Sequence, residues 1–334
     1  MLSNRIKLVR QANRLSLQQL ADNLSASGSE ITRATLSNYE TGKSMPNTAL
    51  LTRLARELGV PVDFFDRPDW TNFSISLFTP PDSVPLRMQE LTAYIQIELE
   101  RYISLDRLLK IPVLWQRPQR EVFHAYDAAR VEQLAQRIRS TWDIGAYPLS
   151  SVCGLLESHG MYLLSIPPLF GIRNLSGYED STGQPFIFYT ANAFVDEFRR
   201  DLLEELGRFF IDADANCEEE VLLHFARALL LPAASVLNDF GEQRQHISYD
   251  ELTIAKQKYG ISRRSIVHRL RELEIISQEF YTNYWINLRQ HSFLWRDSNM
   301  SAPLPLYEAP MLYNMKYARA LEEELLTPGN ERLF

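Results

Sequence analysis

The chain has 334 residues, of which 45% are hydrophobic and 23% charged, as is ordinary for a folded soluble protein of two or three domains. No apolar run approaches the ~20 residues of a membrane-spanning helix, and the first residues lack the apolar core of a signal peptide. Two cysteines, Cys153 and Cys217, are too few for a disulfide framework and suit a reducing compartment. We therefore expect a cytoplasmic protein with no membrane partner.

The net charge of −7 is unevenly distributed along the chain. Residues 1–70 hold nine Lys and Arg against seven Asp and Glu, a net +2, whereas the remainder holds 26 against 35, a net −9. An acidic chain does not favour broad, nonspecific coating of nucleic acid. A locally positive segment on an acidic body is compatible with one small DNA-binding module.

Five short helices are predicted in the N-terminal segment. Ser16 is placed to cap a second helix over residues 17–24, and Thr32 to cap a third over residues 33–41. Gly42 would end the third helix. The first helix has an apolar stripe made of Leu2, Ile6, Val9 and Leu15. Two further short helices are predicted over residues 48–58 and 61–65.

The segment ITRATLSNYETGK at residues 31–43, followed by Met45-Pro46 and Leu54-Ala55, resembles the Cro/C1-type (XRE) helix-turn-helix family over residues 2–66. The resemblance implies that the third helix contacts double-stranded DNA. Arg can form two hydrogen bonds with guanine and Asn two with adenine, whereas Lys and a helix N-terminus suit phosphates. The residues predicted to contact DNA are Gln18, Thr32, Arg33, Ala34, Thr35, Ser37, Asn38 and Lys43.

Two departures from the family pattern leave open how the domain is positioned on the phosphates of the DNA. Leu17 stands where family members often carry Gln, and the turn before the third helix is longer than usual. One such module makes few contacts, so we expect a homodimer that binds two half-sites. The alternative is a five-helix interaction domain that does not contact DNA.

Residues 68–86 are rich in proline and small polar residues and are predicted to form a linker. The linker still contains large apolar side chains, which we expect to dock on a neighbouring element: Trp70, Phe73, Ile75, Leu77 and Phe78. Helices are predicted beyond it over residues 87–109, 127–142, 149–159, 194–210 and 218–231. Strands are predicted over residues 161–166, 177–180 and 185–189, with Gly183 in the last turn.

The segment Glu204-Glu205-Leu206-Gly207-Arg208 is similar to a zinc-peptidase helix that has lost its zinc ligands. In an H-E-x-x-H helix two His lie one turn apart and bind zinc, and the Glu between them is the general base. Here Glu205 keeps the place of the base, but Glu204 and Arg208 take the places of the two His. A guanidinium has no lone pair to donate to a metal.

Fragments around this segment, among them Trp142-Asp143-Ile144-Gly145 and Pro185-Phe186-Ile187-Phe188, resemble an ImmA/IrrE-type metallopeptidase over residues 127–280. The resemblance implies that Glu204, Arg208 and Glu219 occupy the zinc-ligand positions and that Glu205 is the general base. Because Arg208 cannot bind a cation, we expect a pseudo-peptidase with no metal, no other cofactor and no enzymatic activity. Arg208 is expected to form an ion pair with Glu204 or Glu219 at the place that the zinc ion occupies in these metallopeptidases.

Two alternatives remain for this site. Glu204, Glu205, Arg208 and Glu219 can simply form a solvated helix face, with His224 also facing solvent. Cys217, Glu219 and His224 can instead join Glu205 in an unusual metal site.

A second helix-turn-helix outline follows, with Ser248 as the cap of a helix over residues 249–259 and Ser262 as the cap of one over residues 263–273. Its second helix is basic through Arg263, Arg264, His268, Arg269 and Arg271. Either this helix contacts nucleic acid or the unit serves packing and dimer formation. A last helix is predicted over residues 316–326.

The predicted fold is mostly α, α+β overall, with a five-helix DNA-binding domain (residues 1–67), a linker (68–86), a zincin-like pseudo-peptidase domain with a small sheet (87–245) and a helical C-terminal region (246–334). The predicted function is sequence-specific transcription regulation. The pseudo-peptidase domain is expected to serve for sensing, for dimerisation or for binding a protein or peptide partner in the substrate cleft that the resemblance implies. The alternatives are an antitoxin or phage-defence component that binds a protein and autoregulates its operon, and an active zinc peptidase that cleaves a repressor.

Overall fold

The computed structural model describes residues 2–26, 31–66, 73–78, 88–190, 194–290 and 308–326. The chain forms two compact units, which do not follow the order of the predicted domains. Unit 1 comprises Met1–Leu114, Tyr178–Gln184 and Met311–Phe334, and unit 2 comprises Trp115–Gly177 and Pro185–Pro310. The domain boundaries given above stay predictions.

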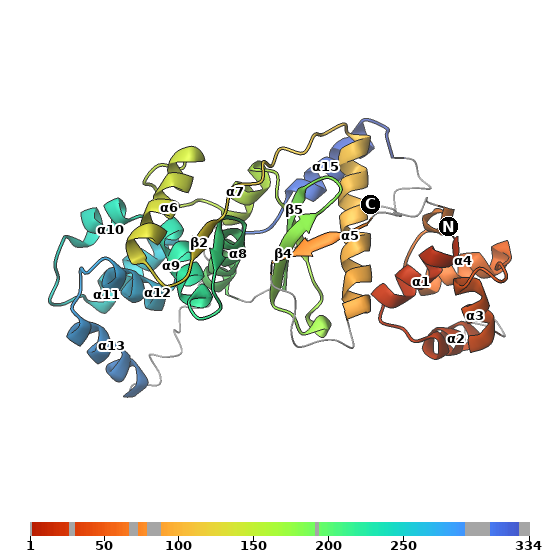
Figure 1. The fold of residues 1–334 in the computed structure, drawn as a ribbon, viewed down its shortest axis with the longest axis horizontal. Coiled ribbons are helices and arrows are strands. Elements are labelled where there is room, and N and C mark those ends of the chain that lie inside the picture. The colour runs from red at the N-terminus through yellow and green to blue at the C-terminus, as the bar shows by residue number, and fades with distance from the viewer. Residues whose placement is uncertain are drawn as a thin grey trace. The chain divides into compact units, whose positions relative to one another are not determined.

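Unit 1 is built almost entirely of helices (Figure 1). Its elements are α1 (Leu2–Ala12), α2 (Leu17–Ala26), α3 (Arg33–Glu40), α4 (Thr48–Glu57), the 3-10 helix η1 (Val62–Asp66), the short strand β1 (Ile75–Leu77), the long helix α5 (Met88–Leu108) and α15 (Leu312–Glu322). The predicted last helix over residues 316–326 thus lies four residues closer to the N-terminus. Of the predicted linker, residues 67–72 and 79–87, with Trp70, lie outside the described part of the chain.

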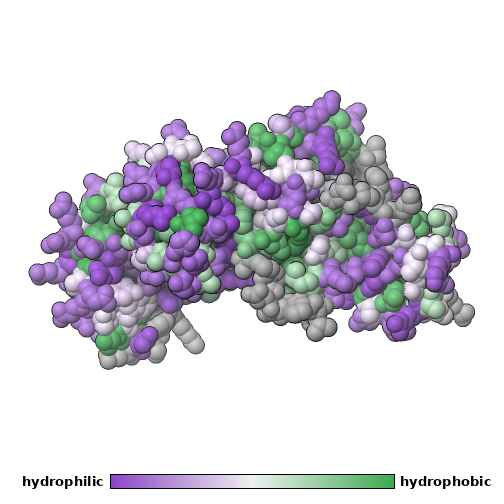
Figure 2. All heavy atoms as spheres, viewed as in Figure 1, coloured by the Kyte–Doolittle hydropathy of each residue, from purple (hydrophilic) through white to green (hydrophobic). Residues whose placement is uncertain are grey.

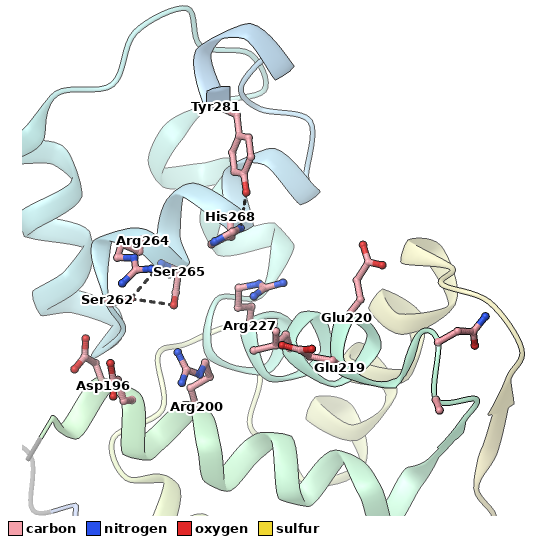
Figure 3. A pocket seen from close by; sticks show the side chains of 14 residues that line it. Asp196, Arg200, Glu219, Glu220, Arg227, Ser262, Arg264, Ser265, His268 and Tyr281 are labelled. Carbon is pink, nitrogen blue, oxygen red and sulfur yellow. Dashed lines mark hydrogen bonds between the residues drawn. The ribbon is translucent and has the colours of Figure 1, made fainter. Parts of the chain in front are cut away.

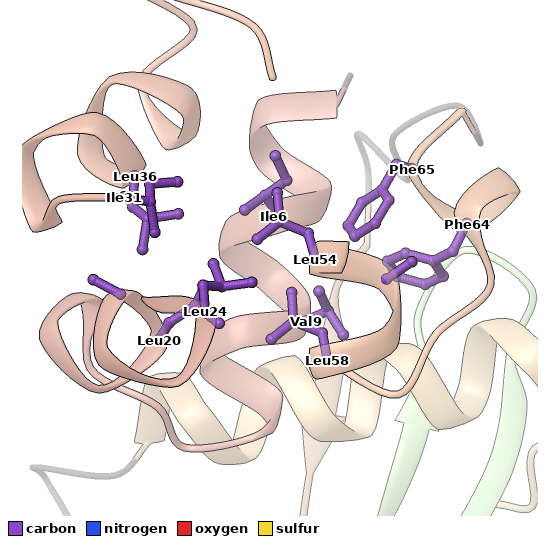
Figure 4. Close-up of a cluster of buried hydrophobic side chains, with 12 residues drawn as sticks. Ile6, Val9, Leu20, Leu24, Ile31, Leu36, Leu54, Leu58, Phe64 and Phe65 are labelled. Carbon is purple, nitrogen blue, oxygen red and sulfur yellow. The ribbon is translucent and has the colours of Figure 1, made fainter. Parts of the chain in front are cut away.

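The N-terminal helices enclose one apolar core (Figure 4). Leu20, Leu24, Leu36 and Leu54 are completely buried in it. Complete burial of a leucine side chain contributes about 1.5–3 kcal/mol to stability, so a few such residues hold these short helices together. On the face drawn in Figure 2, hydrophilic residues cover most of the surface of these helices.

A buried ion pair joins α1 to α5. The Arg5 guanidinium donates to both carboxylate oxygens of Glu100, over 2.6 and 2.8 Å, and also lies over the ring of Phe64. The Arg5 and Glu100 side chains are 2% and 11% exposed. Nearer the C-terminal end of α5, Lys316 of α15 donates to Asp106 over 2.6 Å. The five-helix head and α5 therefore belong to one packed body.

The linker strand β1 lies in unit 1 beside the tip of a hairpin. The Asp180 N–H donates to the Ser74 carbonyl over 3.0 Å, and its carboxylate accepts from the hydroxyls of Ser74 and Ser76. Phe78 packs edge-on against Tyr178. At Phe78 the expected docking of the linker's apolar side chains is confirmed.

Unit 2 combines helices with two small sheets (Figure 1). Its helices are α6 (Ala128–Thr141), α7 (Val152–Ser158), the 3-10 helix η2 (Pro168–Phe170), α8 (Val195–Phe210), α9 (Glu218–Leu230), α10 (Ala233–Phe240), α11 (Tyr249–Tyr259), α12 (Arg263–Glu272) and α13 (Gln278–Gln290). Its strands are β2 (Glu121–Phe123), β3 (Tyr162–Ser165), β6 (Ile211–Ala213) and most of β4 (Asn174–Glu179) and β5 (Gln184–Tyr189), whose connecting tip at residues 178–184 belongs to unit 1.

The larger sheet, in the order β1-β4-β5-β3, is mixed. β5 lies between β4 and β3 and is parallel to β3, with Tyr162 opposite Phe186. β2 and β6 form a separate parallel pair that the sequence did not predict. The predicted fold class, mostly α and α+β overall, is confirmed.

Among the described residues, no single helix has the length and apolar composition needed to cross a membrane, although α9 and α10, bent by 65° at the break between them, meet the requirement as a pair.

The buried Arg5–Glu100 pair generates a prediction about stability. Removing one partner of a buried pair leaves an uncompensated charge, so Arg5→Met should destabilise unit 1 by about 3–5 kcal/mol. The matched control is Arg14→Met, because Arg14, in the turn after α1, also contacts α5, through Glu90, in a more exposed pair. That change should cost about 0–1 kcal/mol. Urea unfolding followed by circular dichroism measures both, and equal costs would contradict the importance of the buried pair.

Candidate nucleic-acid interface

Helix α3 is short and held by caps at both ends. The Thr32 hydroxyl accepts the Thr35 N–H, as predicted, and the positive φ of Gly42 ends the helix. Beyond it the Lys43 N–H donates to the Asn38 carbonyl over 2.9 Å. The helix preceding it, α2, begins with a reciprocal pair of bonds between Ser16 and Gln19. Both caps proposed from the sequence are confirmed.

One face of α3 packs on the core and the opposite face is open. Leu36 is completely buried, whereas Arg33, Ala34 and Asn38 are exposed and Ser37 is half-buried. Residues four apart lie one above the other on a helix, so these four outward positions share one surface. The surface combines an Arg and an Asn, the side chains best suited to two-bond contacts with guanine and adenine.

The flanks of this surface suit phosphates. Lys43 and Thr32 are exposed at the two ends of α3. Thr35 is half-buried and bonded to Thr32. Gln18 is exposed near the start of α2, although its amide also donates to Asp22 over 2.8 Å. The Arg33 and Ala34 N–H groups, which precede the capped Thr35 N–H, have no acceptor within the helix, which makes them donors for an anion.

A second ion pair fixes the direction of α3. Arg10 of α1 donates through two nitrogens to both oxygens of Glu40, over 2.6 and 2.8 Å. Both side chains are largely buried, at 12% and 7% exposed. Such a planar, two-bond contact restricts rotation of the last turn of α3 against α1.

The segment that resembles a peptidase helix, residues 204–208, lies on α8, against α9. Glu205 is buried and accepts a 2.5 Å hydrogen bond from the Ser176 hydroxyl, and burial raises the pKa of its carboxyl group. Gly207 is required by packing, because a Cβ atom there would lie 2.7 Å from Leu222 and 3.0 Å from Phe225. These contacts place α8 unusually close to α9.

The predicted partners of Arg208 are wrong. Arg208 lies 3.5 Å from Glu205 and forms an ion pair with Glu218, whereas Glu204 pairs with Arg200 over 2.8 Å. Glu219 is exposed. The physical reason is the direction of the side chains: position 208 faces the first residue of α9, and Glu204 is already held by the residue one turn earlier. A guanidinium beside Glu205 does not fit a zinc site.

His224 does not face solvent, which corrects one of the alternatives above. Its ring is completely buried and is bonded to the Tyr126 hydroxyl over 2.9 Å and to Glu132 over 2.7 Å. Cys217 is buried near the Phe123 carbonyl. Within the described ranges no group of three or more His, Cys, Asp or Glu could hold a metal ion, so the unusual metal site is not assembled.

The C-terminal helix pair offers little basic surface. Arg269 is completely buried, with its guanidinium bonded to Glu132 and to the Leu231 carbonyl. Arg263 is also buried and lies over the ring of Tyr249. The sequence did not predict α13, whose Tyr281 and Trp285 pack on His268 of α12. The expected basic face is therefore largely covered or used in packing.

Three comparisons with known proteins bear on these surfaces. Residues 6–65 match the family model described as helix-turn-helix. No curated protein and no solved structure matches the chain. The N-terminal segment is therefore a helix-turn-helix domain of the DNA-binding kind, whereas the ImmA/IrrE resemblance stays a prediction.

His268 generates a prediction about pH. Burial, assisted by Arg227, Arg264 and Arg200, lowers its pKa from 6.5 to about 4. Between these pH values the unfolded chain binds more protons at this histidine than the folded one. The contribution of neutral His268 to the free energy of unfolding is therefore fully present above pH 6.5 and is lost as the pH falls toward 4. His268→Asn should therefore flatten the decline between pH 6.5 and 5 in urea unfolding. The exposed His246→Asn serves as control, and an unchanged decline in His268→Asn would contradict the assignment.

Proposed function

We propose that the protein is a sequence-specific DNA-binding transcriptional regulator. The observation that carries the proposal is the open face of α3, with Arg33 and Asn38 exposed on a matched helix-turn-helix domain. Its direction is held by Arg10 and Glu40. A fixed helix that presents base-contacting side chains is what specific major-groove contact requires.

We propose that a homodimer performs this binding. The outward side chains of α3 can contact only a few base pairs. Two such helices on a two-fold axis would double the contacts and bind half-sites about one helical turn apart.

The body is proposed to be a pseudo-peptidase that serves for sensing, partner binding or dimerisation. The support is the Arg208 guanidinium beside Glu205 and Glu218, since a fixed cation there repels a second one. The general base of a metallopeptidase acts on metal-bound water, and this arrangement provides no place for that metal.

The DNA proposal is tested by single substitutions in α3. An operator is first selected from random duplexes with the full chain, and affinities are then measured by fluorescence anisotropy. Arg33→Ala and Asn38→Ala should each cost about 1–3 kcal/mol and relax preference at one position, whereas Lys43→Ala should weaken all duplexes alike. Arg56→Ala, an exposed arginine on α4, controls for lost charge. The proposal fails if Arg33→Ala and Asn38→Ala keep full affinity and sequence preference.

The pseudo-peptidase proposal is tested by rebuilding the lost site. The full chain should purify with far less than one zinc per chain, and the double variant Glu204→His/Arg208→His should gain zinc, because it restores the two imidazoles that the resemblance implies as zinc ligands together with Glu219. Metal content is measured by plasma emission spectrometry after dialysis. Stoichiometric zinc in the wild type that is lost in Glu205→Ala would contradict the proposal that the protein binds no metal. A double variant without zinc would contradict the peptidase resemblance.

A further inference from the structure

Unit 2 contains a cavity of about 760 Å³ that lies outside the DNA-binding surface. It is lined by side chains from α8, α9, α12 and α13, together with the segment before α9 (Figure 3). Sites for small organic molecules usually fall between about 300 and 1,000 Å³. The cavity is therefore much larger than an inorganic ion requires and has the size of a small-molecule site.

Three guanidinium groups converge on this cavity from three helices. Figure 3 shows Arg200 on α8, Arg227 on α9 and Arg264 on α12 around the open space. Arg200 uses two nitrogens for Glu204 and Asp201, and Arg227 uses two for Glu272. Because a guanidinium carries five N–H donors, these contacts leave donors for a further acceptor.

The positive charges of the three arginines all act on the ring of His268, which lines the cavity. Burial and the charges of Arg227, Arg264 and Arg200 together lower the pKa of His268 to about 4, so its ring is neutral near pH 7. The His268 ring is also bonded to the Tyr281 hydroxyl over 2.9 Å. A site where three cations disfavour one more positive charge favours an anion.

The rest of the lining accepts hydrogen bonds. Glu219 and Glu220 are exposed at the start of α9, and Asp196 lies on α8 at the opposite wall. Leu223 and Ala215 are the aliphatic residues of the lining. Carboxylates beside the arginines favour a ligand with hydroxyl groups next to its anionic group, and they disfavour an apolar one.

We propose that this cavity binds a sugar phosphate, with the phosphate among Arg200, Arg227 and Arg264 and the sugar hydroxyls directed at Glu219 and Glu220. A phosphate offers three oxygens to the three guanidinium groups, one more than a carboxylate, and guanidinium–phosphate bonds are among the stronger hydrogen bonds in proteins. The regulatory meaning of such binding rests on the proposed function, but the binding itself does not.

The proposal is tested by isothermal titration calorimetry on the full chain without DNA, so that failure of DNA binding cannot affect the result. The probes are glucose 6-phosphate, ribose 5-phosphate, inorganic phosphate and glucose. At least one sugar phosphate should bind about ten-fold more tightly than inorganic phosphate, and glucose should show no binding. No binding of either sugar phosphate at millimolar concentration, or equal binding of inorganic phosphate, overturns the proposal.

Substitutions locate the site. Arg264 is exposed, so Arg264→Gln should leave the fold intact and weaken both the sugar phosphate and inorganic phosphate about ten-fold. Glu220→Gln should weaken only the sugar phosphate. The matched control is Arg271→Gln, on the same helix but bonded to Gln278 outside the cavity lining. Unchanged binding in Arg264→Gln, or an equal loss in Arg271→Gln, shows that the phosphate binds elsewhere.

Discussion

The buried pair of Arg5 and Glu100 determines how the DNA-binding head is attached. Removing two charges from water is costly, and only a well-aligned, two-bond contact offsets that cost. Once formed, the pair cannot slide by a residue without leaving a charge unpaired. Arg10 and Glu40 apply the same constraint between α1 and α3. The direction of α3, the helix proposed to contact DNA, is therefore set through α1 by α5, so a change that alters α5 would also act on α3.

Unit 2 uses buried charges for a different purpose. Glu132 accepts hydrogen bonds from Arg269 and His224; burial alone would raise its pKa, but these bonds lower it to about 2. The cluster ties α6, α9 and α12 together beneath the surface. It also uses a histidine and an arginine that a reader of the sequence would assign to metal or DNA binding. Basic residues in a helix indicate a nucleic-acid surface only where their charges remain exposed.

Local signals in the sequence predicted most of the helices. Capping residues such as Thr32, Asp127, Ser248 and Ser262 bond to the backbone within three residues, so their partners are adjacent in the chain. The partners of His224 and Arg269 lie 92 and 137 residues away in Glu132. No periodicity specifies such distant pairs. The short β2–β6 ladder and α13, which has no fully buried face, were missed because their patterns are weak.

Packing alone explains why glycine stands at position 207. In the sequence it supports the resemblance to a peptidase helix, but in the structure its role is to let α8 approach Leu222 and Phe225. Any side chain would force these residues apart, whether or not a metal is bound. Positions 204 and 208, to which the resemblance assigns zinc ligands, carry no such packing constraint, since both side chains are only half-buried. Substitutions at positions 204 and 208 would therefore leave the helix pair intact, so Gly207 is evidence for close packing of α8 on α9 and not for a metal site.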